Sequence, residues 1–194
     1  MAGGELYQRS ENVYRAHKLI DEWIAGVENG SRFVFSASHL KTIHKLVADG
    51  QIDDNGNYRR IDVMVGQHLP PPFLEVEGHM ASFFQYLGEN WDSKDLVHLA
   101  AFALWRLLWI HPFTDGNGRS SRAAAYLVLC LKHGRALPGR NTVLTQMMNA
   151  RLAYCDRLRE CDVIYEQTGD VDAAIDPLVR MISDMLVTQL SDAV

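Results

Sequence analysis

The run from Leu96 to Ile110 is apolar on almost every side of a helix, and it constrains the fold more than any other stretch of this chain. A helix without a polar face must be covered all round by other elements, so this run predicts a central helix of a bundle. A second apolar run, Ala123 to Leu131, follows after a short polar stretch. The two runs predict a pair of buried helices joined by a loop that the core holds rigid.

The polar stretch between these helices, His111 to Arg122, gathers residues that suit phosphate chemistry. Gly116-Asn117-Gly118 gives the backbone freedom at two positions, so successive N–H groups can converge on an anion. The helix that we expect to begin near Arg119 adds its positive dipole end. Arg119 and Arg122 share one face of that helix, and both can bind phosphate oxygens.

Two further side chains of the stretch supply a metal ligand and a base. Asp115 immediately precedes the glycines and is a hard oxygen ligand, which suits an Mg²⁺ ion that bridges phosphates. His111 has an ordinary pKa of about 6.5, which suits a general base at neutral pH. Taken alone, a His-Pro is a helix stop and Asp-Gly-Asn-Gly is a surface turn. The whole set in this order predicts a nucleotide phosphate site with a base at its edge.

The stretch resembles the signature of the Fic family (filamentation induced by cAMP), His-Pro-Phe-x-Asp/Asn-Gly-Asn-Gly-Arg-x-x-Arg, with every specified position filled. The resemblance extends over residues 12–135, because residues 40–44 resemble the family's helix before its flap hairpin. Gly56 to Val65 with Pro70-Pro71-Pro72 resembles that hairpin and the proline turn after it. Most known members transfer AMP from ATP to a hydroxyl of a target protein. The resemblance therefore implies a protein adenylyltransferase that uses ATP and Mg²⁺.

The resemblance also implies a role for each signature residue. His111 would deprotonate the target hydroxyl, and Phe113 would anchor the loop in the core. Asp115 would bind Mg²⁺. The backbone of Gly116, Asn117 and Gly118 would form a nest for a phosphate. Arg119 and Arg122 would bind the outer phosphates. Tyr154 matches the family's nucleobase pocket, whereas Cys155 replaces a second aromatic residue there, which leaves the identity of the base open.

Tyr58 to Val65, after the turn signal at residues 53–57, is the one clear strand candidate in the chain and predicts a short β-hairpin. On the residues alone, this hairpin could be inert. The resemblance implies a flap whose edge pairs with an extended segment of a target protein and presents a Ser, Thr or Tyr to His111. The residues expected to dock the target are Arg59, Arg60, Ile61, Asp62 and Val63.

Apolar residues at helical spacing predict further helices over residues 10–27, 38–48, 75–87, 142–162 and 177–190. We therefore expect an all-α, Fic-type helical bundle of seven or eight helices with one short β-hairpin flap. One domain is expected over residues 1–194, with its signature-bearing core at 12–135 and C-terminal helices within 142–190. His44 lies on an apolar helix face and is expected in the core.

Composition narrows the classes of partner and compartment. The net charge of −5 argues against nucleic acid or an anionic membrane as the main partner. The sequence has no long apolar run and no basic-then-apolar leader, which argues against a membrane span or a signal peptide. Its three cysteines are odd in number and lack metal-ligand spacing, so reduced thiols in the cytoplasm are expected. The oligomeric state is not specified by any of these patterns.

Many Fic proteins carry an inhibitory motif, Ser/Thr-x-x-x-Glu-Gly/Asn, whose Glu pairs with the second signature arginine, here Arg122. No Glu followed by Gly or Asn in this chain has Ser or Thr four residues before it. The chain also starts after the point where an N-terminal inhibitory helix would sit. We expect restraint by a separate antitoxin-like protein, or else free binding of the triphosphate.

Two alternatives to AMP transfer remain open on the sequence. The same scaffold could transfer another phosphate-containing group, by UMP or GMP transfer, phosphorylation or phosphocholination, or it could be a non-catalytic binding module. Gly118 stands where the kinase-like relatives carry Lys, which favours nucleotide transfer. An intact His111, Asp115 and Arg122 argue against a module that only binds.

Overall fold

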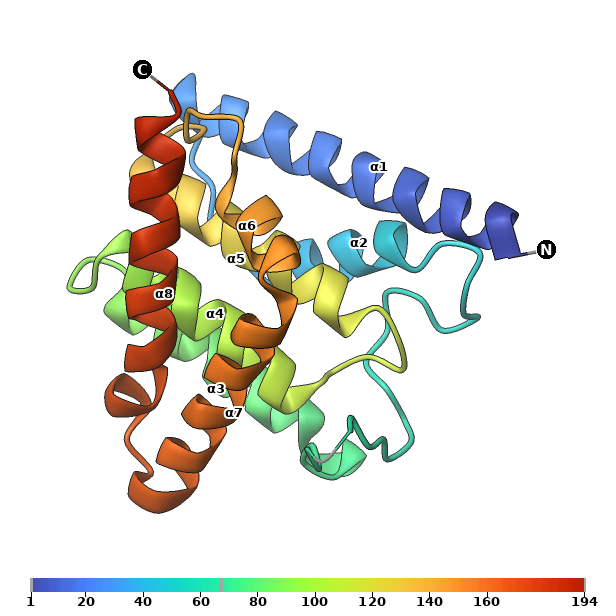
Figure 1. Cartoon of the computed structure of the whole chain (residues 1–194). Coiled ribbons are helices and arrows are strands. Elements are labelled where there is room, and N and C mark those ends of the chain that lie inside the picture. The colour runs from blue at the N-terminus through green and yellow to red at the C-terminus, as the bar shows by residue number, and fades with distance from the viewer. Residues whose placement is uncertain (1, 67, 194) are drawn as a thin grey trace.

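The computed structural model describes residues 2–66 and 68–193, and its regular elements in these ranges are helices (Figure 1). A short 3₁₀ turn, η1, spans Phe73–Glu75. The α-helices are α1 (Ala2–Glu28), α2 (Ala37–Val47), α3 (Val76–Asn90), α4 (Leu96–Ile110), α5 (Asn117–His133), α6 (Val143–Asn149), α7 (Arg151–Thr168) and α8 (Val171–Ser191). The all-α prediction is confirmed for the part of the chain that the structure describes.

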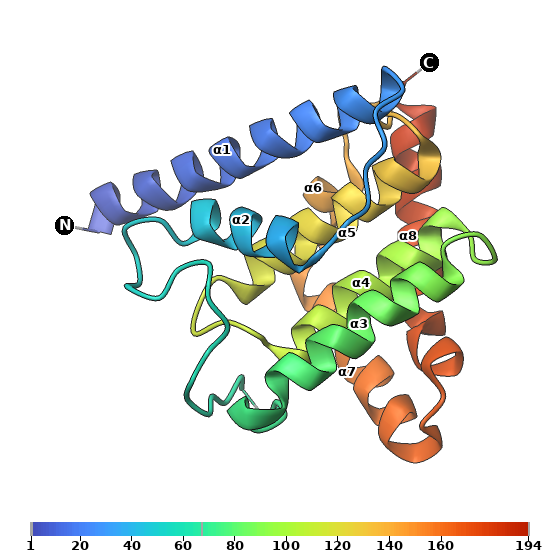
Figure 2. The same ribbon diagram turned by 180° about the vertical axis from the view of Figure 1, so that it is seen from behind.

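Helices α4 and α5 form the centre of the bundle, as their apolar sequences predict. Every side chain of α4 from Leu99 to Leu107 is buried. This helix packs against α3, α5, α7 and α8, while α5 packs against α1 and α2. Figures 1 and 2 show α1 and α2 along one side of α5, with α7 and α8 beyond α4. The signature loop therefore lies between two helices that their neighbours hold in place.

Local chemistry fixes the ends of the two central helices. The side chain of Asp95 accepts a hydrogen bond from the N–H of His98 (2.8 Å) and so caps the start of α4. Left-handed residues border α5 at Gly116 (φ +79°) and Gly134 (φ +87°). Helix α5 begins at Asn117, two residues before the expected start, so Gly118 lies in its first turn.

The predicted β-hairpin is not formed in the described residues. Residues 58–66, which we call the flap segment, contain no strand, and only an isolated antiparallel bridge joins Val65 to His68. The flap segment bonds to the signature loop instead, since the N–H of Arg59 donates to the carbonyl of Pro112 (2.8 Å). Alternation of side chains predicted a strand, but a strand also needs a partner of its own length.

The C-terminal part departs from the prediction at two places. The helix expected over residues 142–162 is divided at Ala150 (φ −98°, ψ 35°) into α6 and α7. Helix α8 begins at Val171 rather than at Pro177, because Asp170 accepts hydrogen bonds from the N–H groups of Asp172 and Ala173. Pro177 then lies in the second turn, where its missing N–H costs the helix one bond.

Two of the three cysteines lie in the core. All three are free thiols, and both Cys130 and Cys161 are buried. Burial raises the pKa of Cys130, and it raises that of Cys161 to about 12, so both stay protonated at neutral pH.

None of the helices that the structure describes is both long enough and apolar enough to span a bilayer.

Candidate active site

The signature loop, residues 111–116, is closed by the side chain of Asn117, which is 2% exposed. Its Oδ1 accepts a hydrogen bond from the N–H of Phe113 (2.9 Å), and its Nδ2 donates to the carbonyl of Phe113 (2.7 Å). Phe113 is buried and stacks on the ring of His44 with centroids 3.6 Å apart. Phe113 thus lies in the core, and the Asn117 amide secures the loop to α5.

Replacing Asn117 by alanine should destabilise the fold. The change leaves the buried N–H and carbonyl of Phe113 unpaired, which we expect to lower the free energy of unfolding by about 2–4 kcal/mol. Urea denaturation of Asn117→Ala against wild type measures this loss. The matched control is Asn90→Ala, which removes one bond to a carbonyl inside α3. An equal midpoint for the two variants would contradict the closing role of Asn117.

His44 connects the signature loop to the turn before the flap segment. The ring is fully buried, its Nδ1 accepts from the N–H of Gly56 (2.8 Å), and its Nε2 lies 2.8 Å from the carbonyl oxygen of Asp115. Because an amide N–H only donates and a carbonyl only accepts, Nε2 carries the hydrogen and the ring is neutral. Burial is the main cause of its lowered pKa, which favours the same state. The sequence places His44 in the core but gives no signal for these two contacts.

His111 ends α4 in a left-handed conformation (φ 51°, ψ 59°) that only glycine adopts readily. Its Nδ1 lies 3.2 Å from the carbonyl oxygen of Leu108, so Nδ1 carries the hydrogen and Nε2 keeps a free lone pair. Burial lowers the pKa of the imidazole, and the Leu108 carbonyl opposes this effect. The neutral ring can therefore accept a proton at Nε2.

The start of α5 offers donors to an anion. The N–H groups of Asn117 and Gly118 bond to no other residue that the structure describes, and the left-handed Gly116 directs the chain into the helix. A 17-residue helix adds a positive dipole end at this point. A side chain at Gly118 would begin 3.3 Å from Nη1 of Arg122, so glycine leaves that guanidinium room.

Asp115 is the one signature carboxylate, and its side chain is 56% exposed. Its Oδ1 accepts from the N–H of Gly116 (2.6 Å), and its Oδ2 lies 3.6 Å from Nη2 of Arg119. No cluster of three or more His, Cys, Asp or Glu side chains suited to a metal occurs in the described part of the chain. One exposed carboxylate beside an anion site fits an Mg²⁺ that takes its other ligands from phosphates and water.

The two signature arginines differ in what they contact. Nη1 of Arg119 donates to the carbonyl of Val47 and to Oε1 of Gln51, both at 2.9 Å, which ties α5 to the end of α2. Arg122 lies beside the buried Tyr154 and faces a cavity. Burial raises the pKa of Tyr154 to about 12 although the Arg122 charge opposes the shift. Their spacing in the sequence predicted the same role for both arginines. In the structure the guanidinium of Arg119 is bonded to Val47 and Gln51, whereas that of Arg122 faces the cavity.

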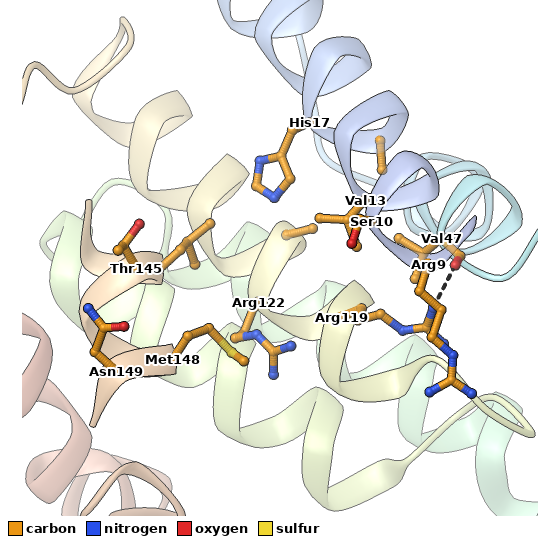
Figure 3. Close-up of a pocket in the computed structure, with 13 residues that line it drawn as sticks. Arg9, Ser10, Val13, His17, Val47, Arg119, Arg122, Thr145, Met148 and Asn149 are labelled. Carbon is orange, nitrogen blue, oxygen red and sulfur yellow. Dashed lines mark hydrogen bonds between the residues drawn. The ribbon is translucent and has the colours of Figure 1, made fainter. Parts of the chain in front are cut away.

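The cavity beside Arg122 has a volume of about 530 Å³ and no Asp or Glu in its wall. Figure 3 shows Arg119 and Arg122 of α5 facing side chains of α1 and α6 across it. The sequence did not assign α1 or α6 to the site, since their contributions come from distant parts of the chain. Those contributions are Arg9, Ser10, Val13, Ala16 and His17 from α1 and Leu144, Thr145, Met148 and Asn149 from α6.

The flap residues divide into one buried residue and an outer group. Arg60, Ile61 and Asp62 are exposed and Val63 is half-buried, so these four can meet another protein. Arg59 is 2% exposed and its guanidinium lies inside the protein, where no target can reach it. The expected docking set is therefore reduced to the other four residues.

The chain is similar to known proteins over about half of its length. Residues 34–129 match the model of the Fic/DOC family. A protein of Drosophila persimilis named Protein adenylyltransferase Fic is 41% identical over 119 residues, which are 54% of this chain and 23% of that protein. The protein of the same name from Culex quinquefasciatus is 41% identical over 88 residues, or 43% of this chain and 17% of that protein. The chain thus spans less than a quarter of these relatives.

Solved structures show the same fold at lower identity. A Fic domain containing signaling protein from Bacteroides thetaiotaomicron has a TM-score of 0.74 at 22% identity, over 95% of this chain and 70% of that one. Fic-1 from C. elegans has a TM-score of 0.69 at 18% identity, over 95% of this chain and 51% of that one. IbpAFic2 covalently tethered to Cdc42 has a TM-score of 0.59 at 11% identity, over 94% of this chain and 57% of that one.

Proposed function

The chain belongs to the Fic/DOC family, and from this premise we propose that it is a protein adenylyltransferase, which transfers AMP from ATP to a Ser, Thr or Tyr hydroxyl of a target protein. The observation that carries the proposal is the position of His111, whose Nδ1 lies against the carbonyl of Leu108 and leaves Nε2 to take a proton, beside the loop that leads into the start of α5. The adenylyltransferases among its curated relatives support the nucleotide and the reaction type.

In the proposed reaction, the target hydroxyl oxygen attacks the α-phosphorus of ATP. A new phosphorus–oxygen bond forms to the target, the bond to the β-phosphate oxygen breaks, and pyrophosphate leaves. The hydroxyl proton passes to Nε2 of His111, while the Leu108 carbonyl holds the hydrogen on Nδ1 and so keeps the ring oriented. The N–H groups of Asn117 and Gly118, with Arg122, bind and orient the phosphates.

Asp115 is the residue that would hold Mg²⁺, with Gly116 fixing the direction of the carboxylate through its N–H. A bound Mg²⁺ neutralises phosphate charge. Tyr154, next to Arg122, is proposed as part of the nucleotide site. The cytoplasm is the proposed compartment, and the free thiols of all three cysteines support it.

Intact-mass spectrometry tests the reaction and the nucleotide together. The purified protein is incubated with Mg²⁺ and each of ATP, GTP, UTP and CTP, alone and with host-cell lysate. We expect the mass increase of one AMP on the protein or on a lysate protein, with ATP only. An ATP analogue with a methylene group between its α- and β-phosphorus atoms should give no adduct, because pyrophosphate cannot leave. Adducts from that analogue, or none from any nucleotide, would contradict the proposal.

Activity should persist at acidic pH, since burial lowers the pKa of His111. His68 and Arg59 also lower it, whereas the Leu108 carbonyl and Asp115 raise it. A base with a lowered pKa stays neutral further into the acid range, so the acid limb of kcat/KM should fall below about pH 6.5. Initial rates measured across the pH range locate the acid limb of the kcat/KM profile. An acid limb above pH 6.5 would exclude, as the base, a His111 whose pKa is lowered.

The target and the restraint on activity are proposed from the surfaces beside the site. Arg60, Ile61, Asp62 and Val63 of the flap segment would dock the target, which is proposed to be a protein because IbpAFic2, a structure of the same fold, is covalently tethered to Cdc42. The cavity wall beside Arg122 contains no carboxylate. A carboxylate that pairs with Arg122 would exclude the triphosphate, and the proposed source of this carboxylate is a separate antitoxin-like protein.

A further inference from the structure

Arg59 is a buried cation whose guanidinium bonds to the backbone around His111. Its side chain is 0% exposed. Nε donates to the carbonyl of His111 (2.8 Å), and Nη2 reaches the carbonyl of Ile110 (3.4 Å). The backbone N–H of Arg59 donates to the carbonyl of Pro112 (2.8 Å), so one residue holds three consecutive carbonyls.

The same guanidinium is also fixed on its outer side. Nη1 donates to the carbonyl of Ile61 (2.9 Å), and Nη2 donates to the carbonyl of Pro71. Asp62, the one carboxylate paired with Arg59, lies 3.7 Å from Nη1 and is 69% exposed. Four of the five side-chain N–H donors of Arg59 are therefore bonded to backbone carbonyls, from Ile61 in the flap segment, from Pro71 after it, and from Ile110 and His111.

The three carbonyls that Arg59 holds surround a strained residue. His111 has φ +51°, and it is the one non-glycine residue with a positive φ in the described chain. A left-handed conformation costs a residue with a side chain about 1–2 kcal/mol, and it persists only where contacts enforce it. The N–H of His111 bonds to Leu107 as the end of α4, but the carbonyls from residue 110 to 112 are held by Arg59.

We propose that Arg59 is a positioning residue for the transfer reaction, because its guanidinium holds the backbone of His111 in the left-handed conformation that sets the direction of the imidazole. This inference rests on the proposed function. Arg59 acts through the His111 backbone, since its side chain is buried inside the protein. The resemblance had assigned Arg59 to target docking. Its buried guanidinium instead connects the flap segment to the backbone on either side of the base, a connection that we call the brace.

Arginine suits this role better than lysine. A guanidinium presents five N–H donors in a planar fork, so it can serve the carbonyls of His111, Ile110, Ile61 and Pro71 at once. A lysine ammonium has three donors on a flexible stem, and it cannot match the separated directions of these carbonyls. The position therefore needs the shape of the guanidinium as well as its charge.

The test compares Arg59→Lys and Arg59→Ala with wild type and with Arg180→Met. Arg180 is a surface arginine of α8 whose side chain is 79% exposed. Three measurements are made on each protein: kcat for AMP transfer, the dissociation constant for ATP, and hydrogen exchange of residues 108–117. For Arg59→Ala, transfer is also measured with millimolar guanidinium and, separately, with ammonium.

We expect both Arg59 variants to lose about 10²-fold in kcat, since a small displacement of a catalytic group has effects of this size. The ATP dissociation constant should change less than twofold, and faster exchange should be confined to residues 108–117. Guanidinium, but not ammonium, should restore part of the transfer in Arg59→Ala. Arg180→Met should match wild type in all three measurements.

Other outcomes would overturn the inference. Wild-type kcat in Arg59→Lys, or an equal loss of kcat and ATP affinity, would show that Arg59 has no specific effect on the base. If Arg59→Ala fails to fold, Arg59→Lys carries the test. If wild type transfers no AMP, the proposed function fails, and hydrogen exchange alone then decides about Arg59: unchanged exchange of residues 108–117 in Arg59→Lys would refute the brace.

Discussion

His111→Ala should reduce AMP transfer by roughly 10²–10⁴-fold, the usual contribution of a general base. The variant removes Nε2, the one proton acceptor that the structure places at the end of α4. Nucleotide binding should stay within about twofold of wild type, because the N–H groups of Asn117 and Gly118 are unaffected. Transfer rates and ATP titrations on the same preparation measure the two effects separately.

The matched control for that variant is His133→Ala, which removes an exposed histidine at the other end of α5. His133→Ala should transfer AMP at the wild-type rate. Alanine also relieves none of the strain at position 111, since its φ remains positive there. Equal transfer by His111→Ala and wild type would remove His111 from the role of base.

Replacement of Asp115 should raise the Mg²⁺ concentration that the transfer reaction requires. Asp115→Asn keeps an oxygen that can accept from the N–H of Gly116 but removes the negative charge, whereas Asp115→Ala removes both. We expect both variants to lose about 10²-fold or more at low Mg²⁺, and excess Mg²⁺ should restore part of the activity. Mg²⁺ titrations of kcat provide the measurement.

Comparison of the two Asp115 variants separates metal binding from loop structure. Similar losses in Asn and Ala indicate that the charge is what matters, while wild-type activity in Asp115→Asn would reduce the carboxylate to a hydrogen-bond acceptor for Gly116. Asp92→Ala, at an exposed loop position, is the control and should match wild type. If the wild-type protein transfers AMP without any Mg²⁺, Asp115 is excluded as a metal ligand.

The central helices and the signature loop could be predicted from the sequence because their signals are local. Residues 96–110 are apolar all round, which requires burial whatever the neighbours are. Gly116 indicates where the chain turns, and it has a positive φ at the start of α5. These features depend on residues next to one another, so a single sequence contains them in full.

The roles of Arg59 and His44 could not be predicted because their partners are distant in the chain. Arg59 bonds to carbonyls about fifty residues away, and His44 contacts a carbonyl 71 residues away. A carbonyl has no side-chain identity, so the sequence cannot indicate which residues such a cation or imidazole will meet. The resemblance implied that Arg59 docks the target, and the apolar face around His44 predicted a core position without indicating its hydrogen bonds.

The hairpin and the C-terminal helices show a related difficulty. Alternation over residues 58–65 is compatible with a strand, but the flap segment pairs with the signature loop and forms a single bridge of its own. The break between α6 and α7 falls at Ala150, a good helix former, so composition gave no warning of it. For the flap segment, contacts with the signature loop overrode the local preference.

The cavity beside α5 places Arg9, His17, Arg119 and Arg122 together in a protein whose net charge is −5. Charges separated by more than about 8 Å are largely screened at physiological ionic strength, so a distant nucleotide experiences neither the arginines nor the overall negative charge strongly. For the nucleotide of the proposed reaction, attraction is therefore strongest at the mouth of the cavity, where several positive side chains act together. Any gain in its rate of association should shrink as the ionic strength rises.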